Sequence, residues 1–215
     1  MAIIAKSNGG GNIERKTVPA GNHVARCYGM IQIGTVEQEY MGEKKKLHKV
    51  MVDFELPLET AVFKEGEEAK PFVISKDFTL SFNEKSTLRK MLESWRGKAF
   101  TDAEAANFDI TKLVGAPCML NIVHKASADG TKTYANITGI TPIPKGLQCP
   151  EQINPTRVLA YDAWNQELFM TLPEWLADKI SSTPEYKAKF SMEAPKQEAF
   201  NLDKVEDDSD STLPF

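Results

Sequence analysis

The stretch Leu47-His48-Lys49-Val50-Met51-Val52-Asp53-Phe54-Glu55-Leu56 decides the fold class of this chain. Apolar residues stand at every second position from Val50 to Leu56, with Met51, Asp53 and Glu55 between them. Successive side chains of a strand point to opposite faces, so this alternation predicts a strand with one buried face. A strand of a parallel sheet, buried on both faces, would read as a continuous apolar run. The stretch therefore favours an antiparallel sheet.

Segments on both sides of this stretch continue the pattern. Residues 23–36 form a long predicted strand, with Gly29 and Gly34 as bend or bulge points, and a turn at 41–42 joins it to the central stretch as a hairpin. Residues 72–82 form a third predicted strand. The apolar face expected for the first strand comprises Ala25, Cys27, Ile31 and Ile33.

A helix and a second hairpin follow. Ser86 is a preferred N-cap residue, and Gly97 is a preferred residue at a helix end. Thr101 and Glu104 form a capping-box pattern that opens a short second helix. Residues 118–125 and 133–140 flank the turn dipeptide at 129–130, which is a strong hairpin signal. The buried stripe expected for the first helix comprises Leu88, Met91, Leu92 and Trp95.

Three strands, a helix and a two-stranded hairpin are the element order of an OB-fold. We therefore predict a mainly β chain: a five-stranded antiparallel Greek-key barrel with a helix between strands three and four. The expected organisation is a flexible N-terminal lead (1–21), an OB-fold single-stranded DNA-binding domain (22–145), a small helical appendage (146–200) and a disordered acidic tail (201–215).

The appendage should contain one capped amphipathic helix and one short helix. Thr171 and Ile180 lie near the ends of the first, and Pro184 opens the second. Its upstream apolar residues could dock on the barrel or on another subunit, so self-association stays open. These residues are Tyr161, Trp164, Leu168 and Phe169.

Charge is divided unevenly along the chain. Residues 1–150 contain 20 Lys and Arg against 17 Asp and Glu, a net charge of +3, whereas residues 151–215 contain 6 against 13, a net charge of −7. A mildly basic body with a strongly acidic end favours an anionic ligand for the body. The acidic end is then a candidate intramolecular competitor for that ligand.

Single-stranded nucleic acid is bound by cations that follow the phosphates and by aromatic faces on which bases stack. Lysines cluster on the first hairpin near two tyrosines, and the second hairpin carries the same two residue types. A lysine run at a hairpin tip also fits a solvated turn, but exposed tyrosines beside it favour binding. The candidate DNA-binding residues are Tyr28, Tyr40, Lys44, Lys45, Lys46, Lys49, Lys125, Lys132 and Tyr134.

The hypothesis that the protein is an enzyme has weaker support. Glu43-Lys44-Lys45 matches a short nuclease element, but that chemistry needs an aspartate on a preceding strand, and Asp53 is the first aspartate in the chain. Asp53 and Glu55 could share a divalent metal, although two acids beside a lysine fit a polar outer face. We expect no enzyme activity, no cofactor and no metal site.

The cysteines Cys27, Cys118 and Cys149 are odd in number and widely spaced, which indicates neither a disulfide framework nor a zinc site. Cys27 and Cys118 are expected to be small core residues. No apolar run reaches the length of a signal peptide or a membrane span. We therefore expect the protein to be in the cytoplasm and to have no membrane partner.

The last nine residues combine an acidic run with an apolar end. They resemble the acidic tip of bacterial single-stranded DNA-binding proteins, which finishes in Ile-Pro-Phe; here Ser211-Thr212 separates the acids from the apolar end and leucine replaces isoleucine. Residues that would bind a partner in such a tail are Asp207, Asp208, Asp210, Leu213, Pro214 and Phe215.

Residues 17–145 resemble the OB-fold single-stranded DNA-binding proteins encoded by bacteriophages. The resemblance is carried by Phe78-Thr79-Leu80-Ser81-Phe82, Ser86-x-Leu88-Arg89-Lys90, Leu113-Val114-Gly115, Asp129-Gly130 and, beyond this range, Leu172-Pro173-Glu174-Trp175 with Glu185-Tyr186. It implies a protein of the host cell cytoplasm that coats single strands during phage DNA replication, recombination or repair. Phage or host replication and recombination proteins would be recruited through the tail. The alternatives are a recombination annealing protein and an OB-fold adaptor that binds protein.

Overall fold

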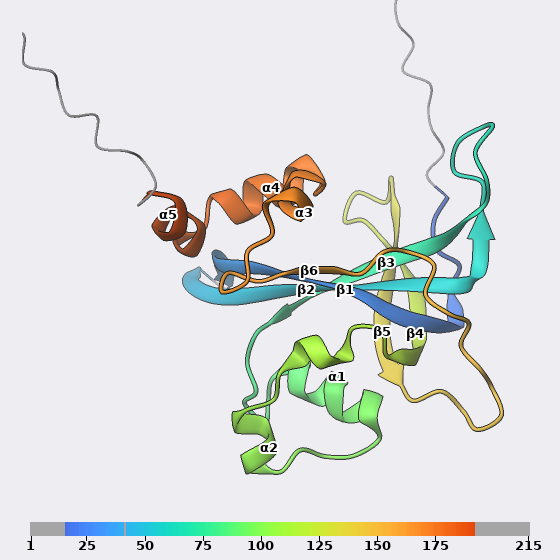
Figure 1. Cartoon of the computed structure of the whole chain (residues 1–215), viewed down its shortest axis with the longest axis horizontal. Coiled ribbons are helices and arrows are strands. Elements are labelled where there is room, and N and C mark those ends of the chain that lie inside the picture. Colours follow the sequence, from blue (N-terminus) through green and yellow to red (C-terminus); the bar gives the residue numbers. More distant parts are fainter. Residues whose placement is uncertain (1–15, 41, 192–215) are drawn as a thin grey trace, which may run out of the picture.

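The computed structural model describes residues 16–40 and 42–191, which are mainly β (Figure 1). The predicted strands, first helix, capping-box helix and second hairpin are confirmed. The strands are β1 (Gly21–Tyr40), β2 (Glu43–Ala61), β3 (Lys70–Thr79), β4 (Pro117–Ala126), β5 (Thr133–Thr141) and β6 (Arg157–Leu159). The helices are α1 (Thr87–Arg96), α2 (Asp102–Ala106), the 3-10 turn η1 (Ile110–Leu113), α3 (Gln166–Met170), α4 (Glu174–Ser181) and α5 (Pro184–Ser191).

The strands form one sheet in the order β3-β2-β1-β4-β5, and β6 pairs with β1. All pairings are antiparallel except that of β6 with β1. Within the described residues, no ladder joins β3 to β5, so the sheet is open where the sequence predicted a closed barrel. The gap is crossed by a side chain instead, because Lys76 Nζ on β3 donates to the Ile137 carbonyl on β5 at 2.5 Å.

Two bulges divide β1 between two apolar clusters. The register with β2 shifts between Cys27 and Gly29 and again between Gln32 and Gly34, so the predicted bulge points are confirmed. The predicted single apolar face of β1 is wrong, because Tyr28 is an extra residue that reverses the alternation after it. Ala25, Cys27 and Met30 belong to one cluster, whereas Ile31 and Ile33 belong to the other.

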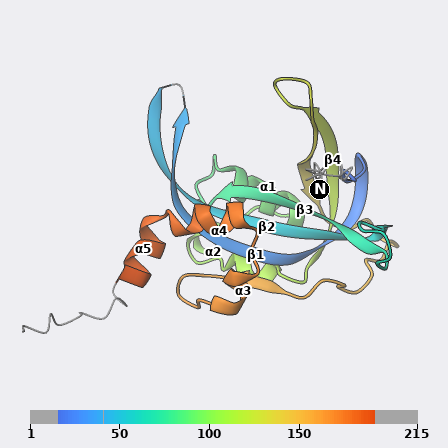
Figure 2. The same ribbon diagram turned by 90° about the horizontal axis from the view of Figure 1, so that it is seen from above.

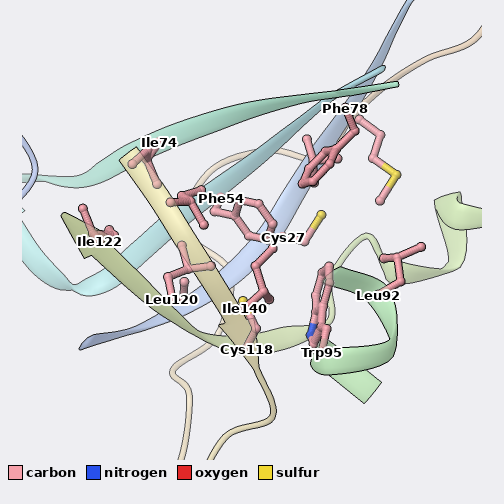
Figure 3. Packing of buried hydrophobic residues seen from close by; sticks show 14 of the residues in the cluster. Cys27, Phe54, Ile74, Phe78, Leu92, Trp95, Cys118, Leu120, Ile122 and Ile140 are labelled. Atoms are coloured by element: carbon pink, nitrogen blue, oxygen red, sulfur yellow. The ribbon is translucent and has the colours of Figure 1, made fainter. Parts of the chain in front are cut away.

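The larger cluster lies between the sheet and α1 (Figure 3). The Ser86 side chain accepts a hydrogen bond from the Arg89 N–H, and Gly97 ends α1 in the left-handed conformation, as the sequence predicted. Trp95 packs on Phe54 with ring centroids 5.6 Å apart. Burial raises the pKa of the Cys27 thiol to about 12, so this cysteine is an inert core residue.

The C-terminal segment (residues 146–191) covers the opposite side of the sheet. Figure 1 shows α3 and α4 above the sheet and α1 below it. Leu176 and Ile180 of α4 are fully buried against the β1 residues of the smaller cluster. The predicted cap of this helix is wrong: α4 begins after Pro173, while Thr171 ends α3. None of the helices in the described part of the chain has the length and apolarity needed to cross a membrane.

Candidate nucleic-acid interface

Two hairpins extend beyond the body of the molecule (Figure 2). Figure 2 shows β1 and β2 rising on one side and β4 and β5 on the other, with their tips apart. Extended hairpins on one side of a sheet can flank a bound strand. Both hairpins carry residues predicted from the sequence as DNA-binding.

The tip of the first hairpin is less basic than its lysine run indicates. Lys44, Lys45 and Lys46 are exposed, as predicted. The register places Glu39 opposite Lys44 and Glu37 opposite Lys46. Lys45 Nζ also lies 3.3 Å from a carboxylate oxygen of Glu43. A turn separates Glu37 and Glu39 from the lysines in the sequence, and the hairpin register brings the two sets together.

A lysine-lined groove lies at the base of the same hairpin. It consists of two adjoining cavities of about 760 and 570 Å³, which share Lys49 and Asp77 as lining residues. We call the two cavities together the basic groove. The first cavity is lined by Thr35, Val36, Glu37, Gln38, Lys46, Lys49, Asp77, Lys179, Ser182 and Pro184. The second is lined by Lys49, Asp77, Phe78, Thr79, Ser81, Asn83, Lys85, Ser86 and Thr87.

The segment that follows β3 separates the basic groove from an apolar cavity. Thr79, Ser81 and Asn83 line the groove, whereas Leu80 and Phe82 line a cavity of about 500 Å³ on the other side. Alternation along an extended chain produces this division. The groove wall thereby presents hydroxyl and amide groups next to its lysines.

The net charge of the groove lining is positive. Its lysines are Lys46, Lys49, Lys85 and Lys179, and its acids are Glu37 and Asp77. The second cavity also reaches Ser86 and Thr87 at the start of α1, where the helix dipole is positive. The groove therefore suits a chain of phosphates. Only Lys46 and Lys49 of these lysines were predicted, because Lys85 and Lys179 come from segments distant in sequence.

A hydrogen-bonded junction fixes α5 against the first hairpin beside the groove. Glu185 Oε2 accepts from Thr35 N at 2.9 Å, and its Oε1 accepts from Thr35 Oγ1 at 2.5 Å and lies 3.2 Å from His48 Nδ1. Burial opposes ionisation of Glu185, but the bonds from Thr35 outweigh it and lower the pKa of this carboxyl. A side chain on Gly34 would meet Tyr161 Oη at 2.9 Å, so the close approach requires glycine.

Three predicted tyrosines differ in where the structure places them. The prediction that Tyr28 is exposed is wrong: it is 5% exposed, because the C-terminal segment covers this face of β1 and brings Arg157 beside it, and burial raises its pKa. The side chain of Tyr40 lies outside the described part of the structure. Tyr134 is 52% exposed and lies directly opposite the exposed Lys125 on the second hairpin. Lys132 is exposed near the tip of that hairpin.

Asp53 and Glu55 do not form the predicted polar outer face. They are 1% and 0% exposed, because the C-terminal segment covers this part of β2. Glu55 accepts hydrogen bonds from Ile153 N at 2.8 Å, Asn154 N at 2.8 Å and Asn154 Nδ2 at 2.6 Å. Among the described residues, no group of three or more His, Cys, Asp or Glu is placed to hold a metal ion. Glu55 therefore attaches the C-terminal segment, whereas Asp53 accepts a hydrogen bond from Ser75 Oγ on the neighbouring strand β3 at 2.6 Å.

A scan against protein-family models finds no match, and a search of curated proteins finds no significant similarity. The geometry of the described residues is therefore the basis for assigning a function. The predicted partner-binding tail, from Asp207 to Phe215, lies outside those residues.

Proposed function

We propose that this protein binds single-stranded DNA without strong sequence preference, with the phosphates in the basic groove. The observation that carries the proposal is the groove itself, in which four lysines from three distant parts of the chain line two adjoining cavities. Lysine contacts phosphate as a point charge, and contacts to phosphate carry no sequence information. Binding through this groove is therefore expected to tolerate any sequence.

The arrangement of the strands supports this proposal. The order β3-β2-β1-β4-β5, with α1 between β3 and β4 in the sequence, is compatible with the proposed OB-fold, although the sheet is not closed between β3 and β5. OB-folds bind oligonucleotides and oligosaccharides. The lysine-lined groove favours the polyanion over the neutral sugar.

The second hairpin supplies a surface for bases. The half-exposed ring of Tyr134 stands beside Lys125, so a base stacked on the ring has a cation next to its phosphate. Stacking of a base on an aromatic side chain is worth about 1 to 3 kcal/mol. A strand that follows the basic groove and reaches this ring contacts both hairpins.

The biological setting that we propose follows the resemblance to phage proteins. The protein coats single strands during DNA replication, recombination or repair, and its acidic tail recruits the proteins that act on those strands. An annealing protein would in addition accelerate the pairing of complementary strands. An adaptor would bind a protein partner and show no affinity for DNA.

The test is a fluorescence titration of labelled oligothymidylate at several salt concentrations. The double variant Lys49→Gln/Lys85→Gln should weaken binding about tenfold at low salt and reduce the slope of log K against log salt by about 1.4, or 0.7 for each lost phosphate contact. The control Lys64→Gln/Lys112→Gln makes the same charge change outside the groove lining.

Each outcome of the titration has a distinct meaning. A weaker effect of the control pair supports the groove as the binding site. Equal effects of the two pairs would show that only overall charge matters and would refute the groove. Absence of binding at low salt would refute the function, and a parallel strand-pairing assay separates annealing from simple coating.

A further inference from the structure

An ion pair spans the middle of the basic groove. Lys179 Nζ of α4 lies 2.9 Å from Asp77 Oδ2 of β3, and both side chains are about one-third exposed to solvent. Asp77 lines both cavities of the groove, whereas Lys179 lines the first. The carboxylate therefore stands where the two cavities meet, in the path of any polyanion that occupies both.

Attachment of α4 does not explain this pair. Leu176 and Ile180 of the same helix are fully buried against the sheet and already fix its position. A surface ion pair contributes little to stability, since water and salt screen its charges. Replacing either partner should therefore leave the C-terminal segment in place.

The charges around Asp77 make it costly for a bound polyanion. Lys46, Lys49 and Lys179 line the first cavity with it, and Lys85 lines the second. The charge of Asp77 also contributes to the raised pKa of Asp53, although burial is the larger cause. A phosphate that enters the groove would therefore find Lys179 already paired with Asp77.

We propose that Asp77 is a built-in competitor that holds Lys179 until a phosphate of the bound strand replaces it. This inference rests on the proposed function, since it names a regulation of the same groove. Binding exchanges one salt-screened ion pair for another: the phosphate takes Lys179 and Asp77 returns to solvent. The acid lowers the affinity of the groove, so that a bound strand is released more readily than four lysines alone would allow.

The test compares four proteins in the oligothymidylate titration: the wild type, Asp77→Asn, Lys179→Gln and the double variant. Asp77→Asn keeps the size of the side chain and frees Lys179, so it should tighten binding roughly fivefold at low salt. The salt slope should stay close to the wild-type value, because Lys179 contacts a phosphate in both complexes. Lys179→Gln should abolish most of this gain. The gain of the double variant over Lys179→Gln should therefore be smaller than the gain of Asp77→Asn over the wild type.

Glu37→Gln is the matched control. Glu37 lines the same cavity but lies opposite Lys46 rather than on Lys179, so its removal makes the same charge change without freeing Lys179. Equal gains for Asp77→Asn and Glu37→Gln, or a gain for Asp77→Asn that is undiminished without Lys179, would overturn the competitor role while leaving DNA binding intact. Absence of oligothymidylate binding by the wild type would refute the proposed function instead.

Because Lys179→Gln changes the surface of α4, its thermal unfolding must be compared with that of the wild type. A midpoint close to the wild-type value shows that the helix remains docked, and the comparison of affinities then applies directly. If the midpoint falls, Lys179→Arg provides the second test. It keeps the charge, so the competitor role requires Asp77→Asn to retain its gain in that background.

Discussion

The substitution Glu55→Gln tests whether the C-terminal segment is attached to the sheet through a buried carboxylate. Glu55 is 0% exposed, and its two oxygens accept hydrogen bonds from Ile153 N, Asn154 N and Asn154 Nδ2. Glutamine has the same shape, so the change creates no cavity. It replaces one acceptor oxygen with an NH2 group that must face an N–H donor.

The cost can be worked from these bonds. If the amide oxygen takes the two donors of Asn154, the N–H of Ile153 loses its acceptor. A buried bond to a charged group is worth about 1.5 to 3 kcal/mol, and the two remaining bonds weaken when their acceptor becomes neutral. The smaller cost of burying an amide rather than a carboxylate offsets part of this loss. We expect a loss of about 3 kcal/mol in the free energy of unfolding.

Urea unfolding followed by tryptophan fluorescence measures this loss, and amide hydrogen exchange locates it. Ile153 and Asn154 should lose protection first. The control is Glu59→Gln on the same strand, where the side chain is 40% exposed and lies 3.1 Å from His23 Nδ1, so that its cost should be below about 1 kcal/mol. If Glu55→Gln stays within about 0.5 kcal/mol of the wild type, the buried carboxylate is not the attachment that we infer.

Two further predictions concern the same covered side of the sheet. Gly34→Ala should cost about 2 to 4 kcal/mol in thermal unfolding, since φ is +101° and the new methyl would lie 2.9 Å from Tyr161 Oη; Gly42→Ala, at φ +80° with open space, should cost only about 1 to 2 kcal/mol. Burial raises the pKa of Asp53, so its charge destabilises the fold at neutral pH and this penalty disappears below the ordinary pKa of 3.8. Asp53→Asn should therefore gain stability relative to the wild type at pH 7 and lose this advantage on acidification; a gain independent of pH would contradict this explanation.

Features fixed by a few neighbouring residues could be predicted from the sequence. The ends of α1 follow from Ser86 and Gly97, and the capping box of Thr101 and Glu104 forms as its residues indicate. Both hairpins also appear where alternation and turn residues place them. Each of these features depends on contacts within a few residues, so the printed sequence contains the information that decides it.

Features that depend on packing between distant segments could not be predicted. Gly29 indicated a bulge, but alternation cannot say which residue the bulge inserts, and so Ile31 and Ile33 were expected on the same face as Cys27. Tyr28 was expected to be exposed, because Arg157, which lies beside it, comes from a distant part of the sequence. Asp53 and Glu55 were predicted to form a solvated face, because the segment that buries them lies about 100 residues later in the sequence. The sequence also could not show that the C-terminal segment is attached to the side of β2 on which these two acids lie.

The candidate site was predicted only in part. Lys49 was identified from the charge of the first hairpin, but its neighbours in the groove are contributed by the loop after β3 and by α4. The ion pair between Asp77 and Lys179 joins residues 102 positions apart, a distance over which strand and helix patterns give no information.

The two bulges of β1 have a consequence for how the molecule unfolds. One continuous strand supplies Ala25 and Cys27 to the larger cluster and Ile31 and Ile33 to the smaller one. Neither cluster can open without disturbing the backbone that the other requires. Melting of the helices α3 to α5 and melting of the main sheet should therefore coincide in a single cooperative transition, as in one folding unit rather than in two independent ones.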